Sequence, residues 1–262
     1  MLTSLQNPLI KQLRKLHRPR ERREQQLFLL EGTHLLEEAY AVDLALVTVC
    51  CTPAWQEQHP DLWEQAIQRS QRTEIVSPEV LEAIATTVQP DGVVATAQRQ
   101  FHLPMPESFR LGIALETLQD PGNLGTVIRT AAAAGAEGLW LSQDSVDIDS
   151  PKVLRASAGQ WFRLPMRVSD DLCADVQQFR AQGVQVVATL PTATLTYWEV
   201  DLTCPTLVLM GNEGAGLSPE LAALADVAVK IPLAVEVESL NVAIASALML
   251  YEAKRQQGFR QV

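Results

Sequence analysis

The spacing of apolar residues along the first third of the chain predicts alternating helices and strands. Leu5, Leu9, Leu13 and Leu16 are three or four residues apart, which is the period of an amphipathic helix. Short apolar or β-branched runs predict strands at residues 27–30, 45–51, 74–76 and 93–97, with helices between them. The first block is therefore predicted to be a small α/β domain.

The remainder of the chain follows a second pattern, in which the apolar runs are continuous rather than alternating. Runs at residues 111–115, 138–141, 184–188, 206–210 and 227–231 are separated by helical segments. This pattern is typical of a parallel sheet that is buried on both faces. A last helix is expected from about residue 240 to residue 257, ending at Gly258.

A proline-bearing stretch between the two blocks predicts a linker. We expect an N-terminal domain over residues 1–100, a linker over 101–110 and a second α/β domain over 111–262. A length of 262 residues fits two modest domains.

Charge is distributed unevenly between the start of the chain and the rest. The net charge is −10, but residues 1–24 hold seven Lys or Arg and two Glu, a net charge of +5 that leaves −15 for the other 238 residues. Such a run is often only a solvated helix face, yet the asymmetry is also typical of a local contact with a polyanion. The candidate RNA-binding residues are Lys11, Arg14, Arg18, Arg20, Arg22 and Arg23.

Composition argues against several classes of protein. No apolar run has the length of a membrane span, and the N-terminal region has no signal-type apolar core, so a cytoplasmic location without membrane contact is expected. The four cysteines have no metal-binding spacing and are expected to be reduced thiols. All four histidines lie within the first 102 residues, so we expect neither a metal nor a histidine base in the second domain.

Three segments that follow predicted strands could carry chemistry. The first is Asp120-Pro121-Gly122-Asn123-Leu124-Gly125, which opens a helix containing a lone Arg129. It can be explained as a turn with Asn123 as the helix N-cap and Arg129 on the surface. Alternatively, the N–H groups at the helix start face a pocket, and the guanidinium binds a phosphate.

The other two segments leave similar alternatives open. The second, Gly211-Asn212-Glu213-Gly214-Ala215-Gly216, has three glycines and a carboxylate in six residues, and it is neither a P-loop nor a dinucleotide fingerprint. The third runs from Ile231 to Asn241 and on into an apolar helix, with Ser239 as a possible cap. All three segments follow strands at the edge where open α/β sheets bind ligands.

Together the three segments resemble the three motifs of the SpoU (TrmH-like) family of the SPOUT superfamily. The first motif is matched by Asn123, Gly125, Arg129 and Thr130, the second by residues 211–213 and 216–217, and the third by residues 231–233 and 239–242. The resemblance covers roughly residues 111–258. The first block also resembles the substrate-binding domain of longer family members, a fold like that of ribosomal protein L30e.

The resemblance implies an S-adenosyl-L-methionine-dependent RNA (ribose-2′-O)-methyltransferase of class EC 2.1.1. It implies an α/β catalytic domain with a deep C-terminal trefoil knot, working as a homodimer through the catalytic domain with the cofactor site near the interface. The apolar final helix could supply such a contact. By matching positions, the cofactor pocket would be lined by Thr189, Leu190, Gly211, Ile231, Leu233 and Leu240. The expected catalytic residues are Asn123, Arg129, Glu213, Ser239 and Asn241.

In the family the arginine matched by Arg129 is assigned to activating the ribose hydroxyl. Because a guanidinium does not readily lose its proton, we expect Arg129 to bind the adjacent phosphate and to stabilise a developing alkoxide. The other four catalytic residues would orient Arg129 and the ribose. The chain departs from many family members at Val235, where they have glycine; if that glycine needs a positive φ, valine would reshape the loop.

Ribosomal RNA is the expected substrate, with transfer RNA as the alternative. A second alternative is a non-catalytic RNA-binding or ribosome assembly factor that keeps the fold, against which the intact set Asn123, Arg129, Glu213 and Asn241 argues. Binding of S-adenosylmethionine distinguishes the enzyme from such a factor. A Rossmann-type methyltransferase is disfavoured because the glycine-rich loop comes late in the chain.

Overall fold

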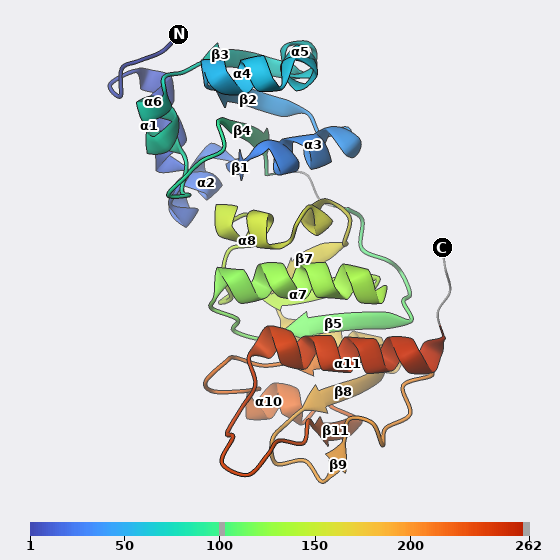
Figure 1. Ribbon diagram of the computed structural model, residues 1–262. Helices are drawn as coiled ribbons and strands as arrows, with labels where there is room; N and C mark the ends of the chain where they lie inside the picture. The colour runs from blue at the N-terminus through green and yellow to red at the C-terminus, as the bar shows by residue number, and fades with distance from the viewer. Residues whose placement is uncertain (100–102, 259–262) are drawn as a thin grey trace. The chain divides into compact units, whose positions relative to one another are not determined.

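Two separate β-sheets organise the residues that the computed structural model describes, 1–99 and 103–258 (Figure 1). The first unit comprises Met1–His102 with Asp147–Phe162, and the second comprises Leu103–Val146 with Arg163–Val262. Residues 100–102, which include the start of the predicted linker, lie outside the described residues. Residues 147–162, which we expected in the second domain, cluster with the first unit instead.

The first unit contains a mixed four-stranded sheet in the order β1-β4-β2-β3. β4 pairs antiparallel with both β1 and β2, and β2 pairs parallel with β3. The strands are β1 (Leu27–Glu31), β2 (Leu46–Cys51), β3 (Ser70–Ile75) and β4 (Val93–Gln98). The helices are α1 (Pro8–Lys15), α2 (Pro19–Gln25), α3 (Thr33–Ala41), α4 (Pro53–Gln58), α5 (Pro60–Arg69), α6 (Pro78–Ile84) and α8 (Pro151–Ala156).

The apolar pattern predicted three of these strands closely and misplaced the fourth. β3 begins at Ser70 rather than residue 74, because it is a polar edge strand whose first residues carry no apolar signal. The short helices α2 and α4 were not expected. Each begins with a proline at its first position, Pro19 and Pro53, which fixes the backbone for a helix start.

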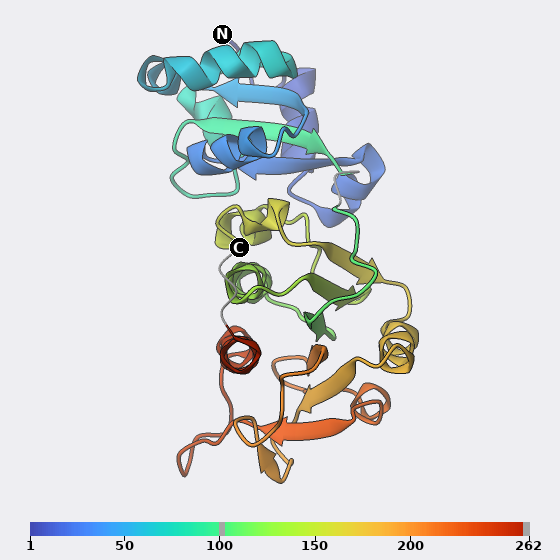
Figure 2. The same cartoon turned by 90° about the vertical axis from the view of Figure 1, so that its right-hand side faces the viewer.

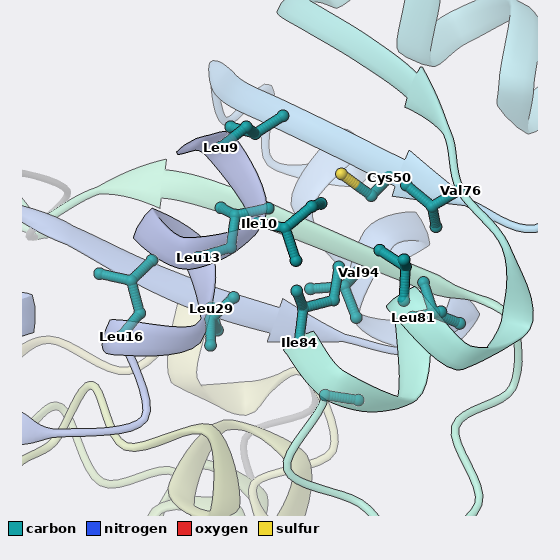
Figure 3. Packing of buried hydrophobic residues seen from close by; sticks show 12 residues of the cluster. Leu9, Ile10, Leu13, Leu16, Leu29, Cys50, Val76, Leu81, Ile84 and Val94 are labelled. Atoms are coloured by element: carbon teal, nitrogen blue, oxygen red, sulfur yellow. The ribbon is translucent and has the colours of Figure 1, made fainter. Parts of the chain in front are cut away.

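One face of this sheet is covered by α1 and α6, which together fill the core (Figure 3). The predicted helical spacing holds for Leu9, Leu13 and Leu16, which are buried against Leu29 of β1 and Val94 of β4. Leu5, by contrast, is 39% exposed and precedes the helix. The apolar stripe of the N-terminal segment is therefore used to close the core of the unit.

Buried ion pairs tie α2 to residues 147–162. Arg22 is 1% exposed; its Nη2 donates to Asp147 Oδ2 at 2.8 Å, and its Nη1 donates to the Leu16 carbonyl at 2.9 Å. Arg99 donates to Asp147 Oδ1 at 3.0 Å and also pairs with Asp149. The guanidinium of Arg22 has no surface left for a ligand, so the structure removes Arg22 from the predicted RNA-binding residues.

The second unit contains a seven-stranded sheet in the order β7-β6-β5-β10-β8-β11-β9, in which every pair is parallel. The parallel, two-faced sheet predicted from the continuous apolar runs is confirmed. Two short edge strands, β7 and β9, were not expected. The strands are β5 (Leu111–Leu115), β6 (Gly138–Ser142), β7 (Met166–Ser169), β8 (Gln185–Thr189), β9 (Leu195–Thr196), β10 (Thr206–Met210) and β11 (Val227–Lys230).

Helices cover both faces of the seven-stranded sheet. Helices α7 (Pro121–Ala134) and α11 (Val242–Gln257) pack side by side on one face, and α9 (Leu172–Ala181) and α10 (Pro219–Ala222) lie on the other (Figure 2). The core beneath α9 and α10 includes Trp140 of β6. A Cβ at Gly138 would lie 2.6 Å from the indole and one at Gly112 would lie 2.8 Å from it, so these paired glycines make room for the ring.

No helix within residues 1–99 and 103–258 is both long enough and apolar enough to cross a membrane.

The Arg22–Asp147 pair generates a stability prediction. Arg22→Ala takes one of two arginines from the buried Asp147 carboxylate, so we expect the free energy of unfolding to fall by about 3 kcal/mol. Arg20→Ala on the same helix removes an exposed pair with Glu24 and is expected to cost less than about 1 kcal/mol. Urea denaturation followed by tryptophan fluorescence measures both, and equal losses would contradict the role of burial.

Candidate functional site

The carboxyl ends of four neighbouring strands form one edge of the seven-stranded sheet. β5, β10, β8 and β11 are adjacent and parallel, so the loops that follow them meet at this edge. The three segments predicted to carry chemistry follow β5, β10 and β11. The segment after β8 adds Leu190 beside Thr189, the last residue of that strand.

Asp120 starts the helix that follows β5. Its carboxylate accepts hydrogen bonds from the N–H groups of Gly122, at 2.6 Å, and Asn123, at 2.9 Å, and Pro121 occupies the first helical position. The interpretation of Asn123 as the N-cap is therefore wrong. Because Asp120 performs the capping, the Asn123 side chain is available for contacts with other loops.

The residues just before this helix are fixed by a small polar cluster. Thr117 has a φ of 54°; its N–H donates to Ser142 Oγ at 2.8 Å and its hydroxyl donates to Asp144 Oδ2 at 2.7 Å. The hydrogen bonds from Ser142 and Thr117 lower the pKa of Asp144 below its usual value. The turn between β5 and α7 is thus held by an ionised carboxylate.

The glycine-rich loop after β10 closes tightly on itself. A Cβ at Gly211 would lie 2.1 Å from the carbonyl carbon of Gly216, so a side chain at this position cannot fit. Asn212 holds the loop from within, since its Oδ1 accepts from the Gly214 N–H at 2.8 Å and its Nδ2 donates to the Thr117 carbonyl at 2.8 Å. The loop is therefore attached to the turn that precedes α7.

Glu116 fastens the other end of the same loop. Its carboxylate accepts from the N–H of Ser218 at 2.7 Å and from the Ser218 hydroxyl at 2.6 Å. Ser218 also caps α10. Sequence reasoning missed Glu116, although an acidic residue directly after the buried strand β5 was a usable signal.

The loop after β11 ends at Asn241, which caps α11. Asn241 Oδ1 accepts from the Ala243 N–H at 2.9 Å, so Asn241 and not Ser239 is the N-cap. The residue of this loop with a positive φ is Glu236, at 77°, and not Val235. Valine at 235 therefore does not occupy the left-handed region, and its side chain is 93% exposed.

A chain of side-chain hydrogen bonds connects the three loops. Asn123 Nδ2 donates to Glu213 Oε1 at 3.0 Å, and Asn241 Nδ2 donates to Asn123 Oδ1 at 2.9 Å. Three of the five predicted catalytic residues are thus brought into contact across 118 residues of sequence. In this arrangement both polar atoms of the Asn123 amide are held by hydrogen bonds, one to the Glu213 carboxylate and one to Asn241.

A cavity of about 350 Å³ lies next to this series of hydrogen bonds. Its walls include all six predicted cofactor residues together with Glu213 and the predicted catalytic Ser239; the six are Thr189, Leu190, Gly211, Ile231, Leu233 and Leu240. The Thr189 hydroxyl oxygen is buried and has no hydrogen-bond partner among the residues the structure describes. A buried polar atom without a partner indicates a place for a ligand group.

Arg129 is not part of the chain of hydrogen bonds. It lies on the exposed side of α7 together with Thr126 and Ala133, and it has no ion pair or hydrogen bond to the described part of the chain. It does not line the cavity either. The structure therefore leaves its guanidinium available to a partner from solvent.

The predicted RNA-binding residues other than Arg22 are exposed. Lys11 and Arg14 lie on α1, and Arg20 and Arg23 lie on α2, with Arg18 directly before that helix. Arg20 pairs with Glu24 at 2.6 Å. These five cations form the basic arm of the first unit.

All four cysteines are free, as expected, and burial raises the pKa values of Cys50 and Cys51 to about 12, which makes them poor nucleophiles. No group of three or more His, Cys, Asp or Glu side chains in residues 1–99 and 103–258 has the arrangement of a metal site.

Both parts of the chain are similar to known protein families. Residues 110–251 match the SpoU rRNA methylase family, and residues 7–95 match the MRM3-like substrate binding domain. A tRNA/rRNA methyltransferase of Synechocystis sp. is 52% identical over 257 residues, 98% of this chain and 94% of that protein. The 23S rRNA (guanosine(2553)-2′-O)-methyltransferase of Bacillus subtilis is 32% identical over 97% of this chain and 98% of its own length.

A solved structure has a similar fold over nearly the whole chain. The AdoMet-bound rRNA methyltransferase from Sinorhizobium meliloti has a TM-score of 0.86 and 35% identity, covering 97% of both chains. The loops, the cavity and the matches point to one assignment. The chain belongs to the SpoU family of RNA 2′-O-ribose methyltransferases and carries an MRM3-like substrate-binding domain before its methylase domain.

Proposed function

We propose that this protein transfers a methyl group from S-adenosyl-L-methionine to a ribose 2′-hydroxyl of ribosomal RNA. The observation that carries the proposal is the cavity at the sheet edge, which is lined by all six residues expected to hold the cofactor. It lies beside the hydrogen-bonded series Glu213–Asn123–Asn241. Similar proteins include several methyltransferases of 23S rRNA, among them the Bacillus subtilis enzyme. Transfer RNA stays the alternative substrate.

The cavity has the chemistry that this cofactor needs. The unpaired Thr189 hydroxyl offers a hydrogen bond, Ile231, Leu233 and Leu240 offer an apolar surface, and the carboxylates of Glu213 and Glu238 stand at its wall. Negative charge beside the cavity favours a cationic ligand. When bound, S-adenosylmethionine supplies an electrophilic methyl group carried on a sulfonium.

The residues around the cavity hold the reacting ribose in position. Asn123 is clamped between Glu213 and Asn241, so its orientation is set before any RNA arrives. The Glu213 carboxylate and the Ser239 hydroxyl stand at the same cavity, where they can accept hydrogen bonds from ribose hydroxyls. Arg129 binds the phosphate next to the reacting sugar and stabilises the developing alkoxide.

The first unit binds the RNA substrate. Two observations support this role: the match to a substrate-binding domain and the five exposed cations of the basic arm. These cations stand out against a net charge of −10 for the whole chain. Because these cations would contact phosphates, binding to RNA weakens as salt rises. We further propose an L30e-like fold for this unit and a cytoplasmic location, where ribosomal RNA and reduced thiols both occur.

The chain path after β10 is tied into a deep trefoil knot. The knot is supported by the path of the last part of the chain. After β10, strand β11 pairs with the earlier strand β8, and the loop of residues 231–241 then leads to α11, which packs beside α7. The glycine loop and this last loop both line the cofactor cavity. A knot holds two such loops in fixed relative positions.

The protein works as a homodimer through α11. Leu240, Ile244 and Tyr251 are 37%, 52% and 46% exposed and lie along the start and the outer face of this helix. Ile244, Leu248 and Tyr251 line a shallow apolar groove with Tyr197. A second copy of the same face covers such a surface by two-fold symmetry.

Replacing Arg129 tests its role in transfer. Arg129→Ala is expected to lower kcat for methylation of unmodified 23S rRNA by about 10²- to 10³-fold, because an electrostatic contact made in the transition state is lost. Binding of S-adenosylmethionine, measured by calorimetry, is expected to stay at the wild-type level. Arg180→Ala, which removes an exposed arginine of α9, is the matched control. Near-normal turnover would remove Arg129 from the mechanism, and absence of cofactor binding in the wild type would favour the non-catalytic RNA-binding factor.

The hydrogen bond between Asn123 and Glu213 predicts energetic coupling. Asn123→Ala and Glu213→Ala are each expected to lower kcat at least about tenfold, and the double variant is expected to fall little further than either single one. Single-turnover rates of the three variants give the coupling energy. Fully additive losses would mean that the two side chains act independently.

The apolar face of α11 predicts a change of oligomeric state. Ile244→Glu introduces a charge into the interface and is expected to convert the dimer into a monomer in sedimentation velocity experiments. Ile67→Glu on α5, where the isoleucine is 56% exposed, is the control and is expected to leave the dimer intact. A wild-type protein that sediments as a monomer would refute the proposed dimer.

A further inference from the structure

Another cavity, of about 270 Å³, lies in the first unit at the start of α3. Its walls come from three places: the β1–α3 turn, the loop before β4, and α8. The lining residues used below are His34, Gln89, Asp91 and Arg155. None of them was predicted as a site residue, and the cavity is separate from the cofactor cavity of the second unit.

Arg155 is fixed at the wall of this cavity by one of its three nitrogens. Its Nη1 donates to Glu31 Oε2 at 2.6 Å and to Thr86 Oγ1 at 2.9 Å. The Glu31 side chain is 3% exposed, and its other oxygen accepts from the Thr86 N–H at 3.0 Å. The Nε and Nη2 atoms of Arg155 have no partner in the described part of the chain, so a preorganised guanidinium presents unused donors.

The remaining polar groups of the wall combine donors and acceptors. Asp91 Oδ2 accepts from the Thr33 N–H at 2.7 Å, which orients the carboxylate and leaves Oδ1 without a hydrogen bond to the described residues. Gln89 and His34 are exposed and have no hydrogen bonds to the described residues. A phosphate is disfavoured here, because the Asp91 carboxylate and the buried Glu31 carboxylate would repel it.

We propose that this cavity takes one unstacked nucleobase of the RNA substrate, reading its edge with Arg155, Gln89 and Asp91. A base edge carries both donors and acceptors, which is the set that the wall complements, and RNA is read mainly through such splayed-out bases. Val88, between the lining residues Thr87 and Gln89, is 95% exposed and offers an apolar contact to the sugar or base face. The inference rests on the proposed action on RNA.

Two variants test the inference without disturbing the fold. Gln89→Ala removes an exposed amide, and Arg155→Lys keeps a positive charge beside Glu31 while losing the further donors. Each is expected to raise the KM for unmodified 23S rRNA about five- to tenfold, with kcat and the Kd for S-adenosylmethionine unchanged. Gln71→Ala, at an exposed glutamine of the edge strand β3, is the matched control and is expected to leave all three constants unchanged.

Direct ultraviolet crosslinking supplies a readout that does not depend on turnover. Peptides that include residues 86–91 are expected to crosslink to 23S rRNA, and those of β3 are not. Unchanged rRNA affinity in both variants together with no crosslink in this loop would overturn the inference. If the wild type bound rRNA and crosslinked here but transferred no methyl group, the proposed enzymatic function would fail while the nucleobase site would stand.

Discussion

The parallel pairing of β5, β10, β8 and β11 is the constraint on which the candidate site depends. Parallel neighbours must end at the same edge of a sheet, so the segments after residues 115, 189, 210 and 230 converge although they are far apart in sequence. Each loop then needs only short-range devices to take its place. Asp120 caps α7, the Gly211–Gly216 approach closes the glycine loop, and Asn241 caps α11.

Cross-links between loops turn this convergence into a defined site. Glu116 and Asn212 attach the glycine loop to the end of β5, and the hydrogen-bonded series Glu213–Asn123–Asn241 joins all three loops. Two of the caps also serve the site: Asp120 leaves the Asn123 side chain unoccupied by capping, and Asn241 uses its oxygen for α11 and its nitrogen for Asn123. An in-line methyl transfer depends mainly on alignment of the ribose hydroxyl with the methyl group, and loops held in fixed positions favour that alignment.

Ion pairs with buried carboxylates organise the first unit. Three arginines, Arg22, Arg99 and Arg155, pair with Asp147, Asp149 and Glu31. These ion pairs join residues 147–162 to residues 22, 31 and 99. The methylase-family match spans residues 110–251 and therefore includes this segment. One stretch of the methylase sequence thus helps to build the substrate-binding unit, and through Arg155 it contributes to the cavity at the start of α3.

The sequence by itself determined the class of fold, the two blocks, the core strands of both sheets and the three motifs, because apolar periodicity and turn residues are local properties. It did not determine partners across the fold. Arg22 has the same local sequence context as its exposed neighbours, and only the approach of Asp147 buries it. The polar edge strand β3 and the role of Glu116 likewise depend on contacts between distant segments. Tertiary structure decides these features because a hydrogen bond or buried ion pair is specified by two positions at once, and one position alone carries no signal of the other.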